Sequence, residues 1–308
     1  MVKVSDLLPP GVQVFERGWL SANNILFRGS DSTALVDSGY FSHRSQTVAL
    51  VQQELDGRPL DLLLNTHLHS DHCGGNAALQ AAFPGIETWI PPGEADAVSR
   101  WDEEALSYRP TGQNCERFSF SGLLQAGSTI LLAGRNWEMH AAPGHDPHSI
   151  ILFEPVSRTL LSADALWESG FGVIFPELLG EPGFDEVAST LDLIESLDPA
   201  LIIPGHGAPF TGISAALSIA RHRLSQFAAD PLRHANHAAK VLLKFKLLEF
   251  QSIEYLSFER WAAAVPYLRT LHARHAVGKS MSIWIGDMVH SLQKSGAAQL
   301  EGTMLRNV

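Results

Sequence analysis

The chain has little cysteine and no long uncharged apolar run. Its two cysteines among 308 residues, Cys73 and Cys115, exclude a scaffold of several disulfides and are typical of a protein from a reducing compartment. No run of about 18 uncharged apolar residues occurs, so no membrane span is predicted. The residues that follow Met1 lack the apolar core of a signal peptide, and we expect a cytoplasmic protein.

Basic residues are also scarce. Lys and Arg number 22 against 33 Asp and Glu, a formal net charge of −11, which argues against a general nucleic-acid binder. The charge is unevenly spread, because residues 231–308 carry ten Lys and Arg with five Asp and Glu, a net of +5, and residues 1–230 carry −16. With 45% hydrophobic residues, the chain can form one large domain with a smaller appendage.

The first two thirds of the sequence alternates short strands with helices. Apolar residues at helical spacing predict helices over about 44–55 and 185–197. Such interleaving indicates a layered α/β architecture. Short apolar runs predict strands at 12–15, 24–27, 33–37, 62–64, 86–90, 128–132, 137–141, 149–153, 159–162 and 201–203.

From about residue 213 the pattern becomes helical. The spacing predicts a short hairpin over 296–308, with Gly302 at its turn. We therefore expect two domains, 1–212 and 213–308, of which the second is smaller and mainly helical. Its helices are expected at 213–228, 237–250, 258–265 and 280–292, with breaks at Pro231 and Pro266.

Four side chains that can bind a metal fall within six residues: His67, His69, Asp71 and His72. They follow the apolar run 62–64 and precede two glycines, so a turn is expected to bring them together. Imidazole and carboxylate in this mixture suit zinc, iron or manganese, whereas calcium prefers oxygen ligands alone.

Three further ligand types stand at the ends of predicted strands or their loops: His145, Asp164 and His206. Loops at one edge of a layered α/β protein are where side chains from distant segments meet. A single histidine beside a glycine is as often a plain turn residue, and only the combination favours a metal centre. Five histidines and two aspartates can hold two metal ions.

The run from Thr66 to Asn76 resembles the signature of metallo-β-lactamase-fold hydrolases, and Pro143-Gly144-His145, Ala163-Asp164 and Pro204-Gly205-His206 match the family's later ligand motifs. The resemblance covers about residues 10–210. It implies an αββα sandwich with a dinuclear centre of divalent metal ions, zinc first, with iron or manganese as alternatives. It also implies that one ion is held by His67, His69 and His145, and the other by Asp71, His72 and His206, with Asp164 between them.

The resemblance implies a hydrolase in which a hydroxide bridging the two metal ions attacks a thioester, ester or lactone of a small acyl substrate. Asp71 is then the candidate catalytic residue, which accepts a proton as the intermediate collapses. The pattern is closest to hydroxyacylglutathione hydrolase (glyoxalase II), lactonases and related thioesterases. True metallo-β-lactamases lack a histidine like His72, and glyoxalase II carries Glu-Tyr-Thr where this chain has Gly207-Ala208-Pro209.

The C-terminal part resembles the winged-helix-like extension of some family members. Its lysines Lys240, Lys244 and Lys246 either face an anionic ligand, such as a coenzyme A phosphate, or form a solvated helix face. The basic tail leaves a ribonuclease or phosphodiesterase as an alternative. A metal-bearing regulator with incidental hydrolase activity is another, and a homodimer is compatible with each.

Two smaller expectations concern the surroundings of the metals. Asp37 follows a Val-rich strand and is expected to support a ligand from behind. The segment after Asp164 is rich in apolar side chains and forms either a wall over the metals or ordinary core. These side chains are Trp167, Phe171, Phe175 and Leu178.

Overall fold

The computed structural model describes residues 4–308, which form two compact units. The first contains the residues up to Leu106 together with Asn114–Leu224, and the second contains Ser107–Gln113 and Ser225–Val308. The boundary expected after residue 212 coincides with the start of helix α8 (Ile213–Ala229), whereas the division between the units lies inside that helix. Within residues 4–308, no helix combines the length and the apolar character that a bilayer crossing requires.

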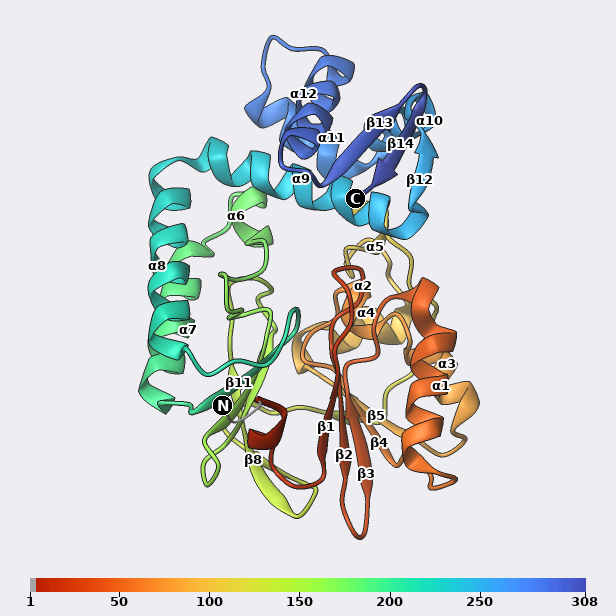
Figure 1. Cartoon of the computed structure of the whole chain (residues 1–308), viewed down its shortest axis with the longest axis vertical. Helices are drawn as coiled ribbons and strands as arrows, with labels where there is room; N and C mark the ends of the chain where they lie inside the picture. The colour runs from red at the N-terminus through yellow and green to blue at the C-terminus, as the bar shows by residue number, and fades with distance from the viewer. Residues whose placement is uncertain (1–3) are drawn as a thin grey trace. The chain divides into compact units, whose positions relative to one another are not determined.

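Two sheets packed face to face form the centre of the first unit, and helices cover their outer faces (Figure 1). One sheet has the order β1-β2-β3-β4-β5-β6, antiparallel from β1 to β3 and parallel from β3 to β6. The other has the order β11-β10-β9-β8-β7, in which only β10 and β11 are parallel. This arrangement confirms the predicted αββα sandwich.

Apart from β6, which no predicted run covers, the strands of the first unit lie close to the predicted runs. They are β1 (Val12–Phe15), β2 (Asn24–Arg28), β3 (Thr33–Val36), β4 (Leu62–Leu64), β5 (Glu87–Ile90), β6 (Gly122–Leu123), β7 (Thr129–Leu132), β8 (Arg135–Ala141), β9 (Ile150–Glu154), β10 (Thr159–Ala163) and β11 (Leu201–Pro204). The helices are η1 (Val4–Leu7), η2 (Phe41–His43), α1 (Arg44–Leu55), α2 (Ser70–Cys73), α3 (Asn76–Ala82), η3 (Pro92–Glu94), α4 (Ala95–Arg100), α6 (Phe175–Leu179) and α7 (Phe184–Leu197).

Strand β4 shows why this sandwich is stable. Successive side chains of a strand point to opposite faces, and here both faces are covered. Leu64 packs into the core between the sheets, with Trp137 and Leu152 of the facing sheet. Leu63 packs on the other side against Val51 of helix α1. The continuous apolar run therefore holds β4 between two apolar cores and fixes the point at which the strand ends and the next segment begins.

The second unit is helical with a small sheet of order β12-β14-β13. Pro231 and Pro266 begin helices rather than break them, because the first helical position needs no N–H donor. The predicted helix at 237–250 therefore starts earlier, and α11 is an additional helix. The elements are α5 (Tyr108–Thr111), α9 (Pro231–Phe250), β12 (Ser252–Glu254), α10 (Tyr255–Ala264), α11 (Pro266–His275), α12 (Met281–Lys294), β13 (Ala298–Glu301) and β14 (Met304–Asn307).

Substitutions at two leucines of the second sheet, one buried and one exposed, test the packing between the sheets. We expect Leu152→Ala to lower the free energy of unfolding by about 2–5 kcal/mol, because it leaves a cavity between the sheets. The matched control is Leu131→Ala in β7, where the side chain is 63% exposed and the expected change is within about 0.5 kcal/mol. Urea denaturation midpoints of the two variants measure the difference, and equal shifts would contradict the assigned packing.

Candidate metal centre

All seven predicted ligands meet at one end of the sandwich. His67 follows β4 after two residues, His69 is the N-cap residue of helix α2, and the helix carries Asp71 and His72. The other three ligands come from the loops after β8, β10 and β11: His145, Asp164 and His206. Two groups result, one of His67, His69 and His145 and one of Asp71, His72, Asp164 and His206, and the ligand atoms within each lie within 4.8 Å of one another.

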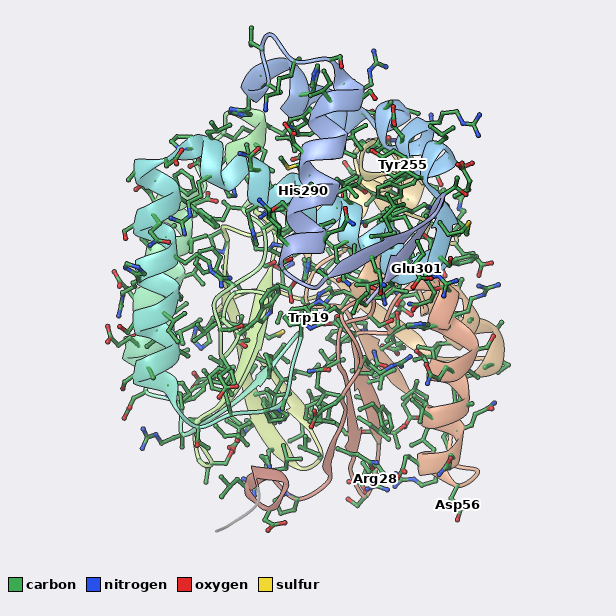
Figure 2. The ribbon with its side chains drawn as sticks, turned by 45° about the horizontal axis from the view of Figure 1, so that its top comes forward. Trp19, Arg28, Asp56, Tyr255, His290 and Glu301 are labelled. Carbon is green, nitrogen blue, oxygen red and sulfur yellow. The ribbon has the colours of Figure 1, made fainter. Side chains whose placement is uncertain are left out.

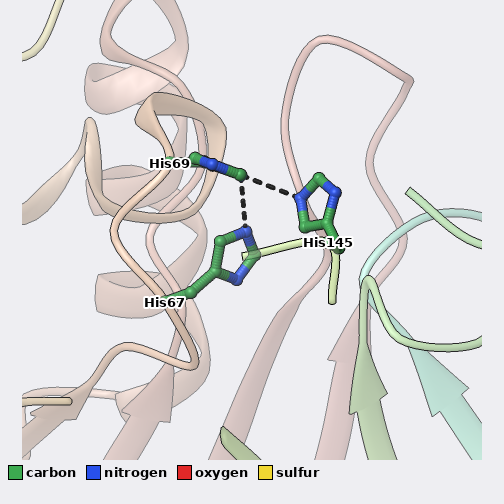
Figure 3. Close-up of side chains that lie close together, drawn as sticks. All are labelled: His67, His69 and His145. Carbon is green, nitrogen blue, oxygen red and sulfur yellow. Dashed lines mark hydrogen bonds between the residues drawn. The ribbon is translucent and has the colours of Figure 1, made fainter. Parts of the chain in front are cut away.

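The first group presents three imidazole nitrogens to a common point (Figure 3). His69 Nδ1 lies 3.0 Å from His67 Nε2 and 2.8 Å from His145 Nε2. These separations are normal for N–H···N hydrogen bonds, but His69 Nδ1 can donate only one proton, so the three nitrogens cannot all be satisfied by one another. A divalent cation at their centre suits this donor set.

The second group mixes carboxylates with imidazoles. His206 Nε2 lies 3.1 Å from Asp71 Oδ2, and His72 Nε2 lies 3.4 Å from Asp164 Oδ1. Asp164 also reaches toward the first group, with its Oδ2 3.5 Å from His145 Nε2. It therefore stands between the two groups, as the family resemblance implies for a bridging ligand.

Each ligating imidazole of the first group contacts a polar atom through its outer nitrogen. His67 Nδ1 lies 3.1 Å from Thr66 Oγ1, and His145 Nδ1 lies 2.5 Å from the carbonyl oxygen of Val173. His69 Nε2 lies 3.6 Å from Asp146 Oδ2. Such outer contacts fix the orientation and the tautomer of a metal ligand.

Asp37 supports His72 in the same way, as predicted. Its Oδ2 lies 2.8 Å from His72 Nδ1, and it also accepts hydrogen bonds from the backbone N–H and the hydroxyl of Thr66. Asp37 adopts a left-handed backbone conformation, with φ of 59°. The carboxylate therefore joins strand end β3 to the ligand-bearing segment that follows β4.

The pKa values of the three histidines in the first group are lowered, which favours the neutral form. Burial lowers the pKa of His69 and of His145 to about 4, and burial together with the neighbouring His72 holds the pKa of His67 well below its usual value. These imidazoles are therefore neutral at pH 7, the form that binds metals.

The second group is charged. Burial opposes ionisation of Asp164, but the adjacent His206 and His72 hold its pKa well below the usual value. Burial also opposes protonation of His72, yet Asp37 and Asp164 raise its pKa well above the usual value. A positive charge is thus stabilised at this position, where a metal ion would replace the proton.

One buried atom supports the fit of a metal to this donor set. His72 Nε2 makes no hydrogen bond of good geometry among residues 4–308, although it is inaccessible to solvent and Asp164 Oδ1 lies 3.4 Å away. A buried nitrogen of this kind is costly unless something is bound to it. The residues present therefore fit divalent metal ions.

The two glycines after the motif are explained by close packing. The backbone angles of Gly74 and Gly75 are ordinary, so the sharp turn predicted from them does not require glycine. A Cβ at Gly74 would lie 2.5 Å from Phe41 N, and one at Gly75 would lie 2.5 Å from Ser38 O. The glycines let the segment after β3 pass directly over helix α2.

The apolar segment after Asp164 has both of the predicted roles. Phe171 and Leu178 are buried in the core. Trp167 is half-buried, with its ring 5.4 Å from that of His206 and its Nε1 donating to Asp164 Oδ1 over 3.2 Å. Phe175 is also half-buried, with its ring 5.2 Å from that of His69.

Trp19 is a further aromatic residue at the site, and no sequence motif marks it. Its ring stacks on His206 at 5.4 Å and is 53% exposed. It stands in the loop between β1 and β2, at the opposite end of these strands from Arg28 (Figure 2). Aromatic side chains consequently border both groups of ligands.

The lysines of the second unit do not form a free cationic face. Lys244 Nζ donates to the carbonyl oxygen of Ala297 over 2.6 Å and to Asn307 Oδ1 over 2.5 Å. Lys246 pairs with Glu249 at 2.9 Å. Lys240 Nζ lies 3.4 Å from Ser291 Oγ. These contacts lie within the unit, so the structure gives no support to a coenzyme A phosphate site at these lysines.

The fold and the donor set together define a metal-binding α/β sandwich protein. A profile of the Metallo-beta-lactamase superfamily matches residues 17–206, which is more than half of the chain and includes all seven predicted ligands. The chain therefore belongs to the metallo-beta-lactamase superfamily.

Similar proteins agree with this assignment. The hydroxyacylglutathione hydrolase of Synechococcus sp. (strain JA-3-3Ab) is 31% identical over 144 residues, which are 47% of this chain and 48% of that protein. The hydroxyacylglutathione hydrolase GloC of Haemophilus influenzae is 26% identical over 199 residues, 60% of this chain and 84% of that protein. This chain thus spans about half the length of the first relative and most of the second.

A solved structure extends the similarity of the fold to both units. A metallo-beta-lactamase family protein from Thermus thermophilus matches with a TM-score of 0.58 and 17% identity, over 97% of this chain and 99% of that chain. The shared fold thus includes the C-terminal unit.

Asp37 offers a test of how the site is supported. We expect Asp37→Asn to weaken metal binding by about 10- to 100-fold, because His72 loses its charged partner. Asparagine tolerates the left-handed backbone and keeps an oxygen for Thr66, so the fold should persist. Competition with a chromophoric chelator measures the affinity. The exposed Asp31→Asn is the control, and an unchanged affinity in Asp37→Asn would show that this contact is dispensable.

Proposed function

We propose that this protein is a dinuclear metal-dependent hydrolase of small acyl thioesters, esters or lactones, with zinc as the first choice of metal and iron or manganese as alternatives. The observation that carries the proposal is the convergence of two ligand groups that share Asp164. His67, His69 and His145 would hold one ion. Asp71, His72 and His206 would hold the other.

Two divalent ions at such a site, when bound, supply an activated water and stabilise the negative charge that develops on a carbonyl oxygen. The protein's own residues orient the ligands: Thr66, Val173 and Asp146 contact the first group from outside, and Asp37 contacts His72. This support keeps the imidazole nitrogens aimed inward, so that little reorganisation accompanies the reaction.

Asp71 is the carboxylate best placed to accept a proton during turnover. Its side chain is 16% exposed, against 6% for Asp164, so a substrate can approach it. Burial alone would raise the pKa of Asp71, but the hydrogen bond from His206 lowers it, and the carboxylate is ionised at neutral pH. An ionised, accessible carboxylate can take a proton and pass it to a leaving group.

The borders of the site favour an apolar acyl group. Trp19 and Trp167 lie beside His206, and Phe175 lies beside His69 and His145. Apolar walls with a few polar groups at their centre are typical of small-molecule sites. The names of the hydroxyacylglutathione hydrolase relatives support a thioester as the first substrate to test.

The direct test is thiol release from a panel of acyl thioesters that includes glutathione and coenzyme A esters. Metal-loaded protein should hydrolyse at least one class, and a chelator-treated sample should not. Esters, lactones and a generic RNA complete the panel. Metal confirmed as bound, with no turnover of any thioester, ester or lactone, contradicts the proposal, and metal-dependent cleavage of RNA alone would favour the nuclease.

The role of Asp71 predicts a specific kinetic change. Asp71→Asn should lower kcat by about 10²- to 10⁴-fold, because proton transfer loses its acceptor, and should change KM much less. Metal content is measured on the same sample, since Asp71 is also a predicted ligand. Normal turnover at full metal occupancy would remove Asp71 from the reaction.

A further inference from the structure

The segment from Trp167 to Val173 contacts the predicted ligands at three residues, Trp167, Gly172 and Val173. Trp167 donates from its ring to Asp164, and the backbone N–H of Gly172 donates to the carbonyl oxygen of Asp164 over 2.9 Å. The carbonyl oxygen of Val173 contacts His145. A group that touches this segment therefore contacts the same short stretch of chain as Asp164 and His145.

Arg223 touches this segment. Trp167 and Gly170 close a tight turn, in which Trp167 N–H donates to the carbonyl oxygen of Gly170 over 2.6 Å. The guanidinium of Arg223 packs against Gly170 so closely that any Cβ there would collide with it, and Gly170 has a φ of +137°. The backbone angle favours glycine at this position, and a Cβ there would displace the Arg223 guanidinium. The turn and Arg223 belong to the first unit.

Arg223 is half-buried, and none of the residues between 4 and 308 provides it with an acidic partner or a hydrogen bond. Its neighbour Arg221 on the same helix shows the usual arrangement, with Asp192 at 2.7 Å and Glu195 at 2.8 Å. Burial lowers the pKa of Arg223, and no neighbouring acid offsets this effect. A partly desolvated cation without a counter-charge costs free energy, and an anion bound to it would offset that cost.

The geometry points to a substrate group as that anion. Gly170 pairs with Trp167 across the turn, and Trp167 donates to Asp164, so Arg223 and this predicted ligand contact the two sides of one tight turn. We propose that Arg223 binds a carboxylate or phosphate of the substrate, several bonds away from the acyl carbon that is attacked. This inference rests on the proposed function and adds to it an anionic substrate.

The charge of the chain favours such a residue if the substrate is anionic. Residues 1–230 carry a net charge of −16, which repels anions in general. A single unpaired guanidinium beside the site provides local attraction, and its fork of donors suits carboxylate and phosphate oxygens.

The experiment compares Arg223→Gln with the matched variant Arg221→Gln. The same acyl group is offered on a neutral thiol (N-acetylcysteamine), on glutathione and on coenzyme A. We expect Arg223→Gln to raise KM for a charged ester by about 10- to 100-fold and to leave the neutral ester unchanged. Arg221→Gln should change none of them. Glutathione and coenzyme A separate carboxylate from phosphate as the group recognised.

Two kinetic outcomes overturn the inference. One is unchanged KM values in Arg223→Gln, and the other is an equal loss for charged and neutral esters, which would show that Arg223 only supports the turn.

A second measurement does not depend on hydrolysis. Calorimetry with S-methylglutathione and S-methyl coenzyme A should show binding that Arg223→Gln abolishes and Arg221→Gln preserves. This result would uphold the anion site even if no thioester were hydrolysed, whereas binding of neither compound by the unaltered protein would overturn it.

Discussion

The structure depends on the cost of burying imidazoles and carboxylates together. Seven such side chains meet at one end of the sandwich, and buried polar groups are unfavourable unless partners satisfy them. Hydrogen bonds from outside the site satisfy the outer nitrogens of ligand imidazoles, as Asp37 Oδ2 does for His72 Nδ1. The inward-facing nitrogens and oxygens are left for a cation. The surrounding sheets supply the rigidity that keeps these atoms within reach of one another.

The local parts of this arrangement could be predicted from the sequence. The motif after β4 places four ligands within six residues, and the alternation of Leu63 and Leu64 between two cores fixes where the motif begins. The later ligands stand at strand ends or in the loops after them and carry motifs of their own. Ligands with strong local patterns can therefore be identified without any knowledge of which segments pair in space.

Contacts between distant segments could not be predicted. Trp19 stacks on His206 across most of the chain length, and Arg223 lies against Gly170, with no motif to mark either contact. Pro231 and Pro266 suggest breaks because proline disrupts a helix interior, but it is well tolerated at a first position. Gly74 and Gly75 suggest a sharp turn, whereas the close approach of another segment explains them.

The ligand groups and the residues around them have different roles. The ligands define what the site can do. The aromatic borders and Arg223 belong to loops and to helix α8, and in the proposed function these residues would select the acyl compound. The central claim concerns the ligands. Metal analysis of reconstituted, dialysed protein should find two divalent ions per chain, and no more than one in His206→Ala. Less than one ion in the unaltered protein, or no loss in the variant, would contradict the account.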